Sequence, residues 1–552
     1  MESDKNIEVR EKDSLNNLLL SERSSNSSFI DGSIDNNSGS EKEFQSIKGS
    51  VNDRPCFHER EAMLFREELH KHSHITSQGV LKQYEENQIN SRLNNKKSIW
   101  KNFIALCTGL LFAFTSFMPL RNIQTSLYSM HHLANISLAA MYFSFAIGCS
   151  VSSWLAQNAR PKGIILVAMF GHVMYTATNV YPSMMTLVPA SCLFGFFHAP
   201  LWSMQELLIA SYGAAYSALS SIPIEKSIQQ FQGVFLIFCH AAQIFGNLLE
   251  SAILHMGGEY HTNETDIDPV RTGYYHLEIY NISESPKDLI WLGPFGYRVE
   301  PEIEYPNEKV DYESVVKFVF LILAALGMTI ICLFFNKPDI IVQKRKCAFR
   351  EKMHEMGCFL RSKVFAFLGL LMLFSGMQQA VVICNVTKMY GTLTLGLHMV
   401  GYMMMCYGTC QLVILLVVEK LQSRLKPTVT ILNAFIITLG LLVLLYVWEP
   451  TPNTLFRILG YVGLWGAVDG LWQTQLQCIL VSSVGRKESA VVTFRILQSL
   501  GLVTVFLLDI WLSLLTQICI IGAVLVFGVI MYMILEVIQN PMISNEPFPF
   551  QV

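Results

Sequence analysis

Long apolar blocks recur along this chain and constrain its fold more than any other feature. Each block has roughly 18–25 residues, the length of an α-helix that crosses the hydrocarbon core of a bilayer. The chain is 51% hydrophobic and only 15% charged, whereas about a quarter of the residues are charged in ordinary soluble domains. We therefore expect an all-α polytopic membrane protein. The net charge of −3 gives no indication of nucleic-acid binding.

About twelve membrane-spanning helices can be placed on these blocks, in two sets of six. The first set lies at 103–120, 134–156, 163–181, 184–210, 231–256 and 315–335, and the second at 364–384, 397–419, 428–448, 455–481, 490–511 and 513–537. The sequence thus predicts two six-helix halves within one lipid bilayer.

The Lys and Arg residues predict the orientation of the spans. Lys96, Lys97 and Lys101 precede the first span, and the most basic loop, 336–363, follows the sixth. Because positively charged loops stay in the cytoplasm, we expect both termini inside and the polar segment 257–312 outside. The charge of the basic loop can be purely topogenic, or it can bind anionic lipid headgroups.

The expected outer segment contains two N-x-[ST] acceptors, which begin at Asn263 and Asn281. Such sequons are glycosylated when they lie on the lumenal or extracellular side, so both are predicted to carry sugar. None of the 13 cysteines lies in this segment, which argues against a disulfide framework.

The predicted domains follow from these boundaries. They are a disordered cytoplasmic tail at 1–99, a six-helix half at 100–335 with its outer loop at 257–312, the basic loop at 336–363, a second half at 364–540, and a cytoplasmic tail at 541–552. The first tail is rich in Ser, Asn, Glu and Lys and cannot bury enough apolar surface to offset its chain entropy.

The tenth predicted span holds the most unusual stretch, GYVGLWGAVDGLWQTQLQ at 460–477. A carboxylate at membrane depth costs several kcal/mol unless it faces protein or water. Asp469, Trp472 and Gln473 fall on one helix face, and Gln475 lies within two turns. We expect these four residues to form a central cavity or a regulatory site that faces the interface between the halves.

A structural helix–helix contact is the alternative interpretation of this stretch. Small residues that let a neighbouring backbone approach closely recur there, at Gly460, Gly463, Gly466 and Gly470.

Three charged residues in other spans are candidates for the same cavity. Arg121 lies at the outer end of the first span, Glu206 towards the inner end of the fourth, and Arg495 about one turn inside the eleventh. Structural pairing is the alternative role for each of them.

Motifs of enzyme chemistry do not occur in the sequence. It has no glycine-rich phosphate loop with Lys-Ser/Thr, no HExxH and no GxSxG. No Cys or His pairs recur at the spacing of zinc ligands. We expect a protein that is not an enzyme and that needs no cofactor or metal.

Five stretches together carry a family resemblance. They are PLRNIQTSLY (119–128), PASCLFGFFHAPLWS (189–203), FQGVFLIFCHAAQIFGNLLES (231–251), VDGLWQTQ (468–475) and FRILQSLG (494–501). On these stretches the chain resembles the Unc-ninety-three (uncoordinated) family, a divergent branch of the major facilitator superfamily, over about residues 102–536. Arg121 departs from the neutral polar residue that the family pattern has at this position.

The resemblance implies a major-facilitator-like fold and a role as a regulatory partner of a two-pore-domain potassium channel. It places the protein in the plasma membrane. Two alternatives remain: a secondary transporter of an unknown solute, and a trafficking chaperone for another membrane protein. The loop WLAQNARPKG (154–163) keeps only fragments of the major facilitator pattern GxxxDRxGRR, which argues against a conventional solute carrier.

Overall fold

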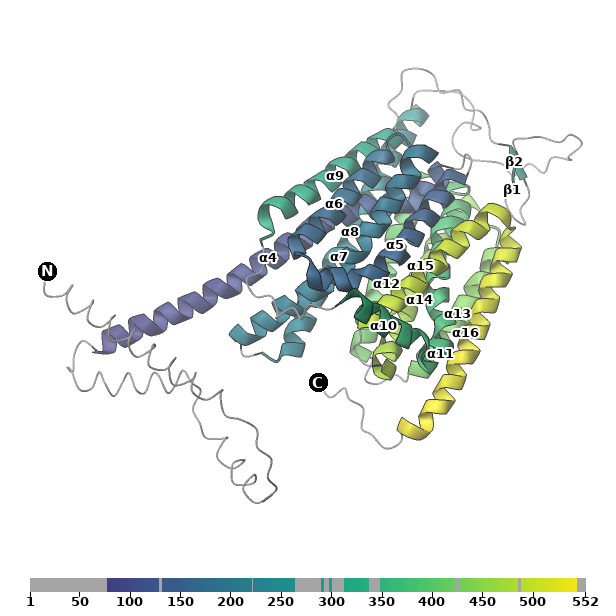
Figure 1. The fold of residues 1–552 in the computed structure, drawn as a ribbon. Coiled ribbons are helices and arrows are strands. Elements are labelled where there is room, and N and C mark those ends of the chain that lie inside the picture. Colours follow the sequence, from purple (N-terminus) through teal and green to yellow (C-terminus); the bar gives the residue numbers. More distant parts are fainter. Residues whose placement is uncertain are drawn as a thin grey trace, which may run out of the picture. The chain divides into compact units, whose positions relative to one another are not determined.

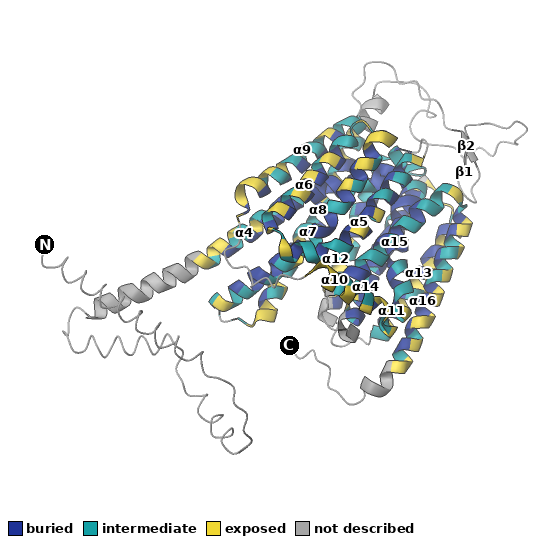
Figure 2. Ribbon diagram, viewed as in Figure 1, coloured by how far each residue is buried: buried dark blue, intermediate teal, exposed yellow. Residues whose placement is uncertain are grey.

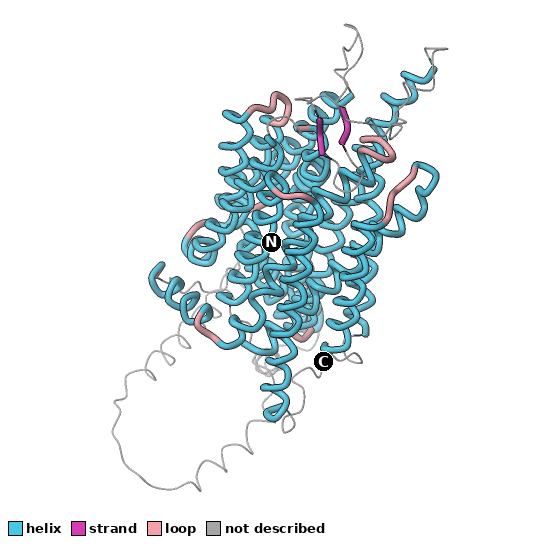
Figure 3. Tube along the Cα trace, turned by 90° about the vertical axis from the view of Figure 1, so that its right-hand side faces the viewer, coloured by secondary structure: helices cyan, strands magenta, loops and turns pink. Residues whose placement is uncertain are grey.

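A computed structural model describes residues 77–128, 132–220, 222–263, 289–291, 297–299, 312–336, 348–421, 427–484 and 488–543. Contacts divide the chain into two units, Met1–Asn90 and Ser91–Val552, and the second unit contains a bundle of long helices. Within this unit the helices run side by side (Figure 1; Figure 3).

The helices follow one another in the order that the apolar blocks predict. The first half consists of α4 (Ser77–Leu127), α5 (Leu133–Asn158), α6 (Pro161–Thr178), α7 (Met184–Ser220), α8 (Ile224–Asn263) and α9 (Tyr312–Phe334). The second half consists of α11 (Lys363–Val381) with η3 (Val382–Thr392), α12 (His398–Leu421), α13 (Pro427–Val447), η4 (Pro452–Thr454), α14 (Leu455–Val484), α15 (Glu488–Trp511) and α16 (Leu514–Ile543). The helix α10 (Phe349–Leu360) lies between the halves in sequence, and β1 (Leu289–Trp291) pairs antiparallel with β2 (Tyr297–Val299).

Ten of the described helices are long and apolar enough to cross a membrane. The helices α6 and α14 occupy the positions of the third and tenth predicted spans and complete the two sets of six. They are less apolar because α6 includes Lys162 and His172, and α14 carries Asp469. The predicted all-α polytopic fold is confirmed.

The two halves meet along two helix pairs. One pair is α5 with α15, and the other is α8 with α12. Within the halves the most extensive packing is of α5 on α7 and of α12 on α14. Each half is thus a bundle of its own, and one face of α5, α8, α12 and α15 joins it to the other half.

The contact between α12 and α14 depends on glycine. A Cβ atom at Gly466 would lie 2.1 Å from the Tyr407 carbonyl oxygen, so only glycine fits this approach. Gly463 and Gly470 also face residues of α12, whereas a Cβ atom at Gly460 would meet nothing within 4 Å. Three of the four glycines in the tenth predicted span therefore allow the close approach of a neighbouring helix.

The bundle is apolar on its outer surface and contains polar groups inside, as expected for a protein in lipid. Large exposed side chains on the described helices include Phe170, Ile322, Val443 and Phe527. Figure 2 shows exposed positions along the outward sides of α6, α9 and α16, with buried positions between the helices.

Two lysines that flank the predicted spans, Lys96 and Lys162, lie at the same end of the bundle. Lys96, near the start of the apolar part of α4, lies over the ring of Tyr216 near the end of α7. The Nζ atom of Lys162 donates to the carbonyl oxygen of Cys332, 2.9 Å away, near the end of α9. This gathering is what the distribution of positive charge in the sequence predicts.

Two segments differ from the sequence expectation. The helix α4 begins at Ser77, inside the stretch expected to be a disordered tail; residues 77–97 contain no Pro, and Gln, Lys, Glu and Leu, which favour helices, make up about half of them. The predicted basic loop 336–363 includes the helix α10, in which Phe359 is buried. Residues 1–76 and 544–552 lie outside the described residues.

A further feature is the π-helix η3, which continues α11. Most π-helices are single turns inserted in α-helices, often at functional sites, whereas η3 has 11 residues. The carbonyl oxygen of Ile383 in η3 accepts hydrogen bonds from the hydroxyls of Thr125 in the first half and Thr387. Hydrophobic periodicity does not distinguish such a segment from an α-helix.

Candidate functional site

The carboxylate of Asp469 on α14 lies at the centre of a set of neutral hydrogen-bond donors. On α11, Gln378 donates to Oδ1 at 2.9 Å, and Gln379 donates to Oδ1 and Oδ2 at 3.1 and 3.2 Å. On α12, the Tyr407 hydroxyl and the Gln411 amide donate to Oδ2 at 2.8 and 2.7 Å. We call these five residues the Asp469 cage.

The Asp469 cage lies within the second half of the bundle. All of its residues come from α11, α12 and α14, and Asp469 is only 2% exposed. The expectation that Asp469 faces the interface between the halves is therefore wrong. The carboxylate turns towards its own half because amide and phenol donors there replace the water that it loses.

The other residues predicted in α14 have different surroundings. The Trp472 indole donates to the Thr438 hydroxyl of α13 at 3.0 Å, so its side chain contacts a different helix from Asp469. Gln473 is half-buried and is a further hydrogen-bonding neighbour of Asp469. Gln475 is buried at 4% exposure. Of the three residues, only Gln473 lies beside Asp469.

Glu206 and Arg495 form an ion pair that joins the two halves. A guanidinium nitrogen of Arg495 on α15 donates to a carboxylate oxygen of Glu206 on α7. The Glu206 side chain is 46% exposed and that of Arg495 is 22% exposed, so the pair is accessible although it lies between the halves. The sequence identified both residues but could not show that they meet.

A line of rings leads from this ion pair into the first half. The Arg495 guanidinium lies 5.2 Å from the centre of the Trp202 ring, in a cation–π arrangement. The Trp202 indole donates to Nε2 of His198 at 2.9 Å. The rings of His198 and His172 are 5.1 Å apart, and neither nitrogen of His172 has a hydrogen-bond partner.

Arg121 joins neither the Asp469 cage nor the ion pair. Its guanidinium donates to Tyr142 Oη at 3.1 Å and to Asn122 Oδ1 at 3.1 and 3.3 Å, all in the first half. Asn122 in turn donates to Oδ1 of Asn247 on α8 at 3.0 Å. Arg121 is near enough to Tyr407 of the cage for its charge to act on the Tyr407 hydroxyl.

Asp509 on α15 is a further carboxylate inside a span that pairs with amides. Asn135 of α5 donates to Asp509 Oδ2 on α15 at 2.8 Å, which is a further link between the halves. Asn385 of η3 donates to Gln517 on α16 at 3.0 Å. Asn135 and Asn385 begin N-x-[ST] sequons, but both amides are buried and hydrogen-bonded inside the bundle.

The predicted glycosylation sites are not tested by the structure. The side chain of Asn263 at the end of α8 and the whole of Asn281 lie outside the described residues. Among the described residues, no group of three or more His, Cys, Asp or Glu side chains could hold a metal ion.

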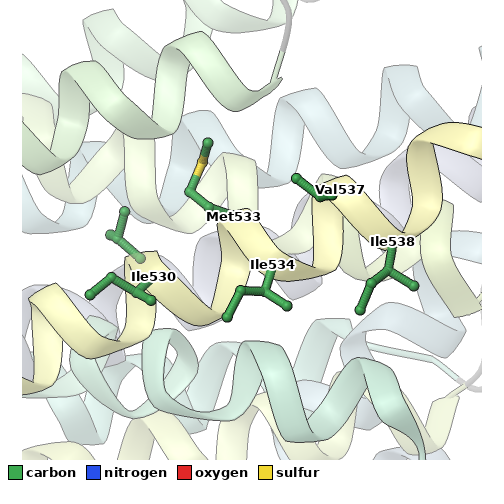
Figure 4. Close-up of a pocket in the computed structure, with 6 residues that line it drawn as sticks. Ile530, Met533, Ile534, Val537 and Ile538 are labelled. Carbon is green, nitrogen blue, oxygen red and sulfur yellow. The ribbon is translucent and has the colours of Figure 1, made fainter.

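An apolar groove of about 370 Å³ lies on the outward surface of α16. It is lined by Val529, Ile530, Met533, Ile534, Val537 and Ile538 (Figure 4). Its lining contains no polar side chain, and most of these residues are exposed. A surface of this kind suits contact with lipid chains.

Within the described residues, the site offers a buried carboxylate held by neutral donors, an accessible ion pair between the halves, and an arginine that joins neither of them. Nucleophilic catalysis needs a nucleophile with an adjacent base, and these three groups do not provide that arrangement. They can hold charge at membrane depth and join the halves of the bundle.

Solved structures with the same fold include two transporters. The nucleoside transporter NupG superimposes with a TM-score of 0.54 at 11% identity, over 80% of this chain and 98% of that chain. A bacterial homolog of the human lysosomal transporter Spinster gives 0.51 at 12% identity, over 82% and 99%. At this identity the likeness shows the fold alone, and it confirms the major-facilitator-like arrangement.

Curated relatives cover most of the chain. Protein unc-93 homolog A of Xenopus laevis is 26% identical over 442 residues, which are 80% of this chain and 94% of that protein. The human protein of the same name is 25% identical over 457 residues, which are 81% of this chain and 96% of that protein. A Caenorhabditis elegans protein named as a candidate potassium channel regulatory protein, unc-93, is 27% identical over 421 residues, 75% and 57%.

A family model described as ion channel regulatory protein UNC-93 matches residues 130–533 of the chain. This match includes α14 with Asp469 and the helices that supply its hydrogen-bond donors. Because it covers well over half of the chain, this membrane protein belongs to the UNC-93 family.

Proposed function

We propose that this chain is a non-enzymatic regulatory partner of a potassium channel, and that the channel is of the two-pore-domain class. The proposal is supported by membership of a family described as ion channel regulatory and by the relative named as a potassium channel regulator. Regulation of this kind requires only that the channel binds two states of the bundle with different affinity.

The main structural support for this proposal is that Asp469 is buried and hydrogen-bonded within its own half. A coupling group in a secondary transporter exchanges its ligand with water on each side of the membrane in turn. Asp469 is 2% exposed and accepts hydrogen bonds from four side chains of its own half. Such a carboxylate is suited to stabilising the packing of α11, α12 and α14 in the state of the bundle that the channel binds more tightly.

A secondary transporter is the second candidate. It is favoured by the ion pair of Glu206 with Arg495, which is accessible and joins the two halves. Ion pairs between repeats can break and form again as the halves rock against each other. Arg121, half-buried in the first half and near Tyr407 of the cage, adds a positive charge that is suited to attracting an anionic solute.

The test is channel current measured together with surface biotinylation in the same cells. A two-pore-domain potassium channel is expressed alone or together with this chain. As a control, it is also expressed with a version of this chain in which α14–α16 are deleted. The regulatory proposal predicts a changed current per channel at the surface. A changed amount of surface channel with constant current per channel would indicate a trafficking chaperone instead. No effect on either quantity contradicts both.

We further propose a plasma-membrane location with the tails 1–99 and 541–552 and the basic loop 336–363 in the cytoplasm, and the loop 257–312 outside. The gathering of Lys96 and Lys162 at one end of the bundle supports this orientation. Enzymatic deglycosylation should shrink the wild-type protein and leave an Asn263→Gln/Asn281→Gln double variant unchanged. The orientation is wrong if neither sequon carries sugar and an epitope in the loop stains only after permeabilisation.

A further inference from the structure

The Asp469 cage has an unbalanced charge. Among the described residues no Lys, Arg or His forms an ion pair with Asp469. The nearby Arg121 directs its donors to Tyr142 and Asn122 instead. Neutral donors offset part of the cost of burying a carboxylate, but they bring no opposite charge.

The cage also contains a buried acceptor without a donor. Gln378 is 1% exposed and its amide is aimed at Asp469, because Nε2 lies 2.9 Å from the carboxylate. The Oε1 atom of the same amide has no hydrogen-bond partner. Buried polar atoms of native proteins nearly always have a partner, so an atom of this kind indicates a missing one.

A positive ion bound at the carboxylate would supply the missing charge and a partner for Oε1 of Gln378 in its present orientation. A half-turn of a glutamine amide exchanges its NH₂ group for its carbonyl oxygen, and this torsion is soft and nearly two-fold. Three amides surround the carboxylate, from Gln378, Gln379 and Gln411, together with the Tyr407 hydroxyl. With Gln379 and Gln411 turned in this way and their NH₂ groups towards water, the cage offers carboxylate, carbonyl and phenol oxygens, the ligand type that hard cations take.

We propose that the Asp469 cage binds a monovalent alkali cation, K⁺ or Na⁺. One carboxylate balances one positive charge, whereas a divalent cation would leave a net charge buried in the bundle. An organic ammonium ion is excluded by size, since Asp469 and Gln378 are at most 2% exposed and the side chains close around the carboxylate. Gln379, Gln411 and Gln473 are half-buried and give the ion a polar way in.

This inference goes beyond the proposed function and does not depend on it, because it is tested on the purified protein without a channel. The protein is prepared in detergent in a buffer whose only cation is N-methyl-D-glucamine. Binding of ⁸⁶Rb⁺ and ²²Na⁺ is then measured by equilibrium dialysis, and thermal unfolding is followed at constant ionic strength with K⁺, Na⁺ or N-methyl-D-glucamine.

We expect saturable binding of at least one ion and a higher unfolding temperature in its presence. Asp469→Asn should lower the affinity by about a hundredfold or more, and Gln378→Leu by about tenfold. Asp509→Asn is the matched control, because it removes another bundle carboxylate that accepts from amides. It should leave the affinity unchanged.

Three results would overturn the inference. They are the absence of saturable binding to folded wild-type protein, equal affinity in wild type and Asp469→Asn, and an unfolding temperature that depends on pH but on neither cation. The last result would show that a proton alone balances the charge of Asp469. A loss of cation binding in Gln378→Leu with normal unfolding temperature supports the proposal even if Asp469→Asn does not fold.

Discussion

Replacement of Asp469 by alanine removes the acceptor that four side chains share. Tyr407 and Gln378 are buried, so their donors cannot be hydrated in its place. Gln379 and Gln411 are half-buried and can turn towards water. Each buried donor that loses its acceptor costs about 1–3 kcal/mol, so the two buried donors together cost about 2–6 kcal/mol.

Asparagine at the same position should be milder. It keeps one acceptor oxygen and nearly the same volume, and its own NH₂ group can donate to a glutamine carbonyl after a half-turn of that amide. We therefore expect the free energy of unfolding to fall in the order wild type, Asp469→Asn, Asp469→Ala. A loss of about 2–6 kcal/mol is a large part of the 5–15 kcal/mol that stabilises a typical protein.

The assay is thermal and denaturant unfolding of purified protein, followed by tryptophan fluorescence. Trp472 and Trp465 are buried on the same helix as Asp469 and report on its packing. An alanine variant that unfolds at the wild-type temperature would refute the argument, because it would show that the cage donors have other acceptors. Equal losses for asparagine and alanine would show that charge, and not the number of acceptors, decides the stability.

Two other predictions concern the packing of the helices. Gly466→Ala should lose about 1–3 kcal/mol of unfolding free energy through its clash with Tyr407, whereas Gly460→Ala, with open space around it, should be neutral or gain up to about 1 kcal/mol. Glu206→Arg and Arg495→Glu should each lower the free energy of unfolding. The double exchange should recover about 0.5–3 kcal/mol as coupling energy in a double-mutant cycle. Additive losses would mean that the pair does not form.

The sequence predicts the order and number of the helices because lipid allows few alternatives to long apolar helices. It also identifies Asp469, since a carboxylate inside an apolar block is costly. It does not identify the partners of Asp469, because they lie 58–91 residues away in the chain. These partners are Gln378, Gln379, Tyr407 and Gln411. Helical periodicity shows which residues share a face, but not which helix that face contacts.

The same limit explains the other differences. Glu206 and Arg495 were identified one by one, yet 289 residues separate them and only the packing of the halves brings them together. The direction of Asp469 was predicted wrongly because sites between repeats are common in this fold, while the amides that attract the carboxylate come from its own half. A signal was available in retrospect: Gln378 and Gln379 are adjacent amides inside an apolar span.

The most direct test of this account is the current through a co-expressed two-pore-domain potassium channel, with wild type compared with Asp469→Asn. The current is divided by the amount of channel at the surface, and cells are matched for the surface amount of this chain. The account predicts that wild type changes this ratio and that Asp469→Asn, at the same surface amount, changes it less or in the opposite sense. Equal effects of the two proteins, or no effect of either, would contradict it.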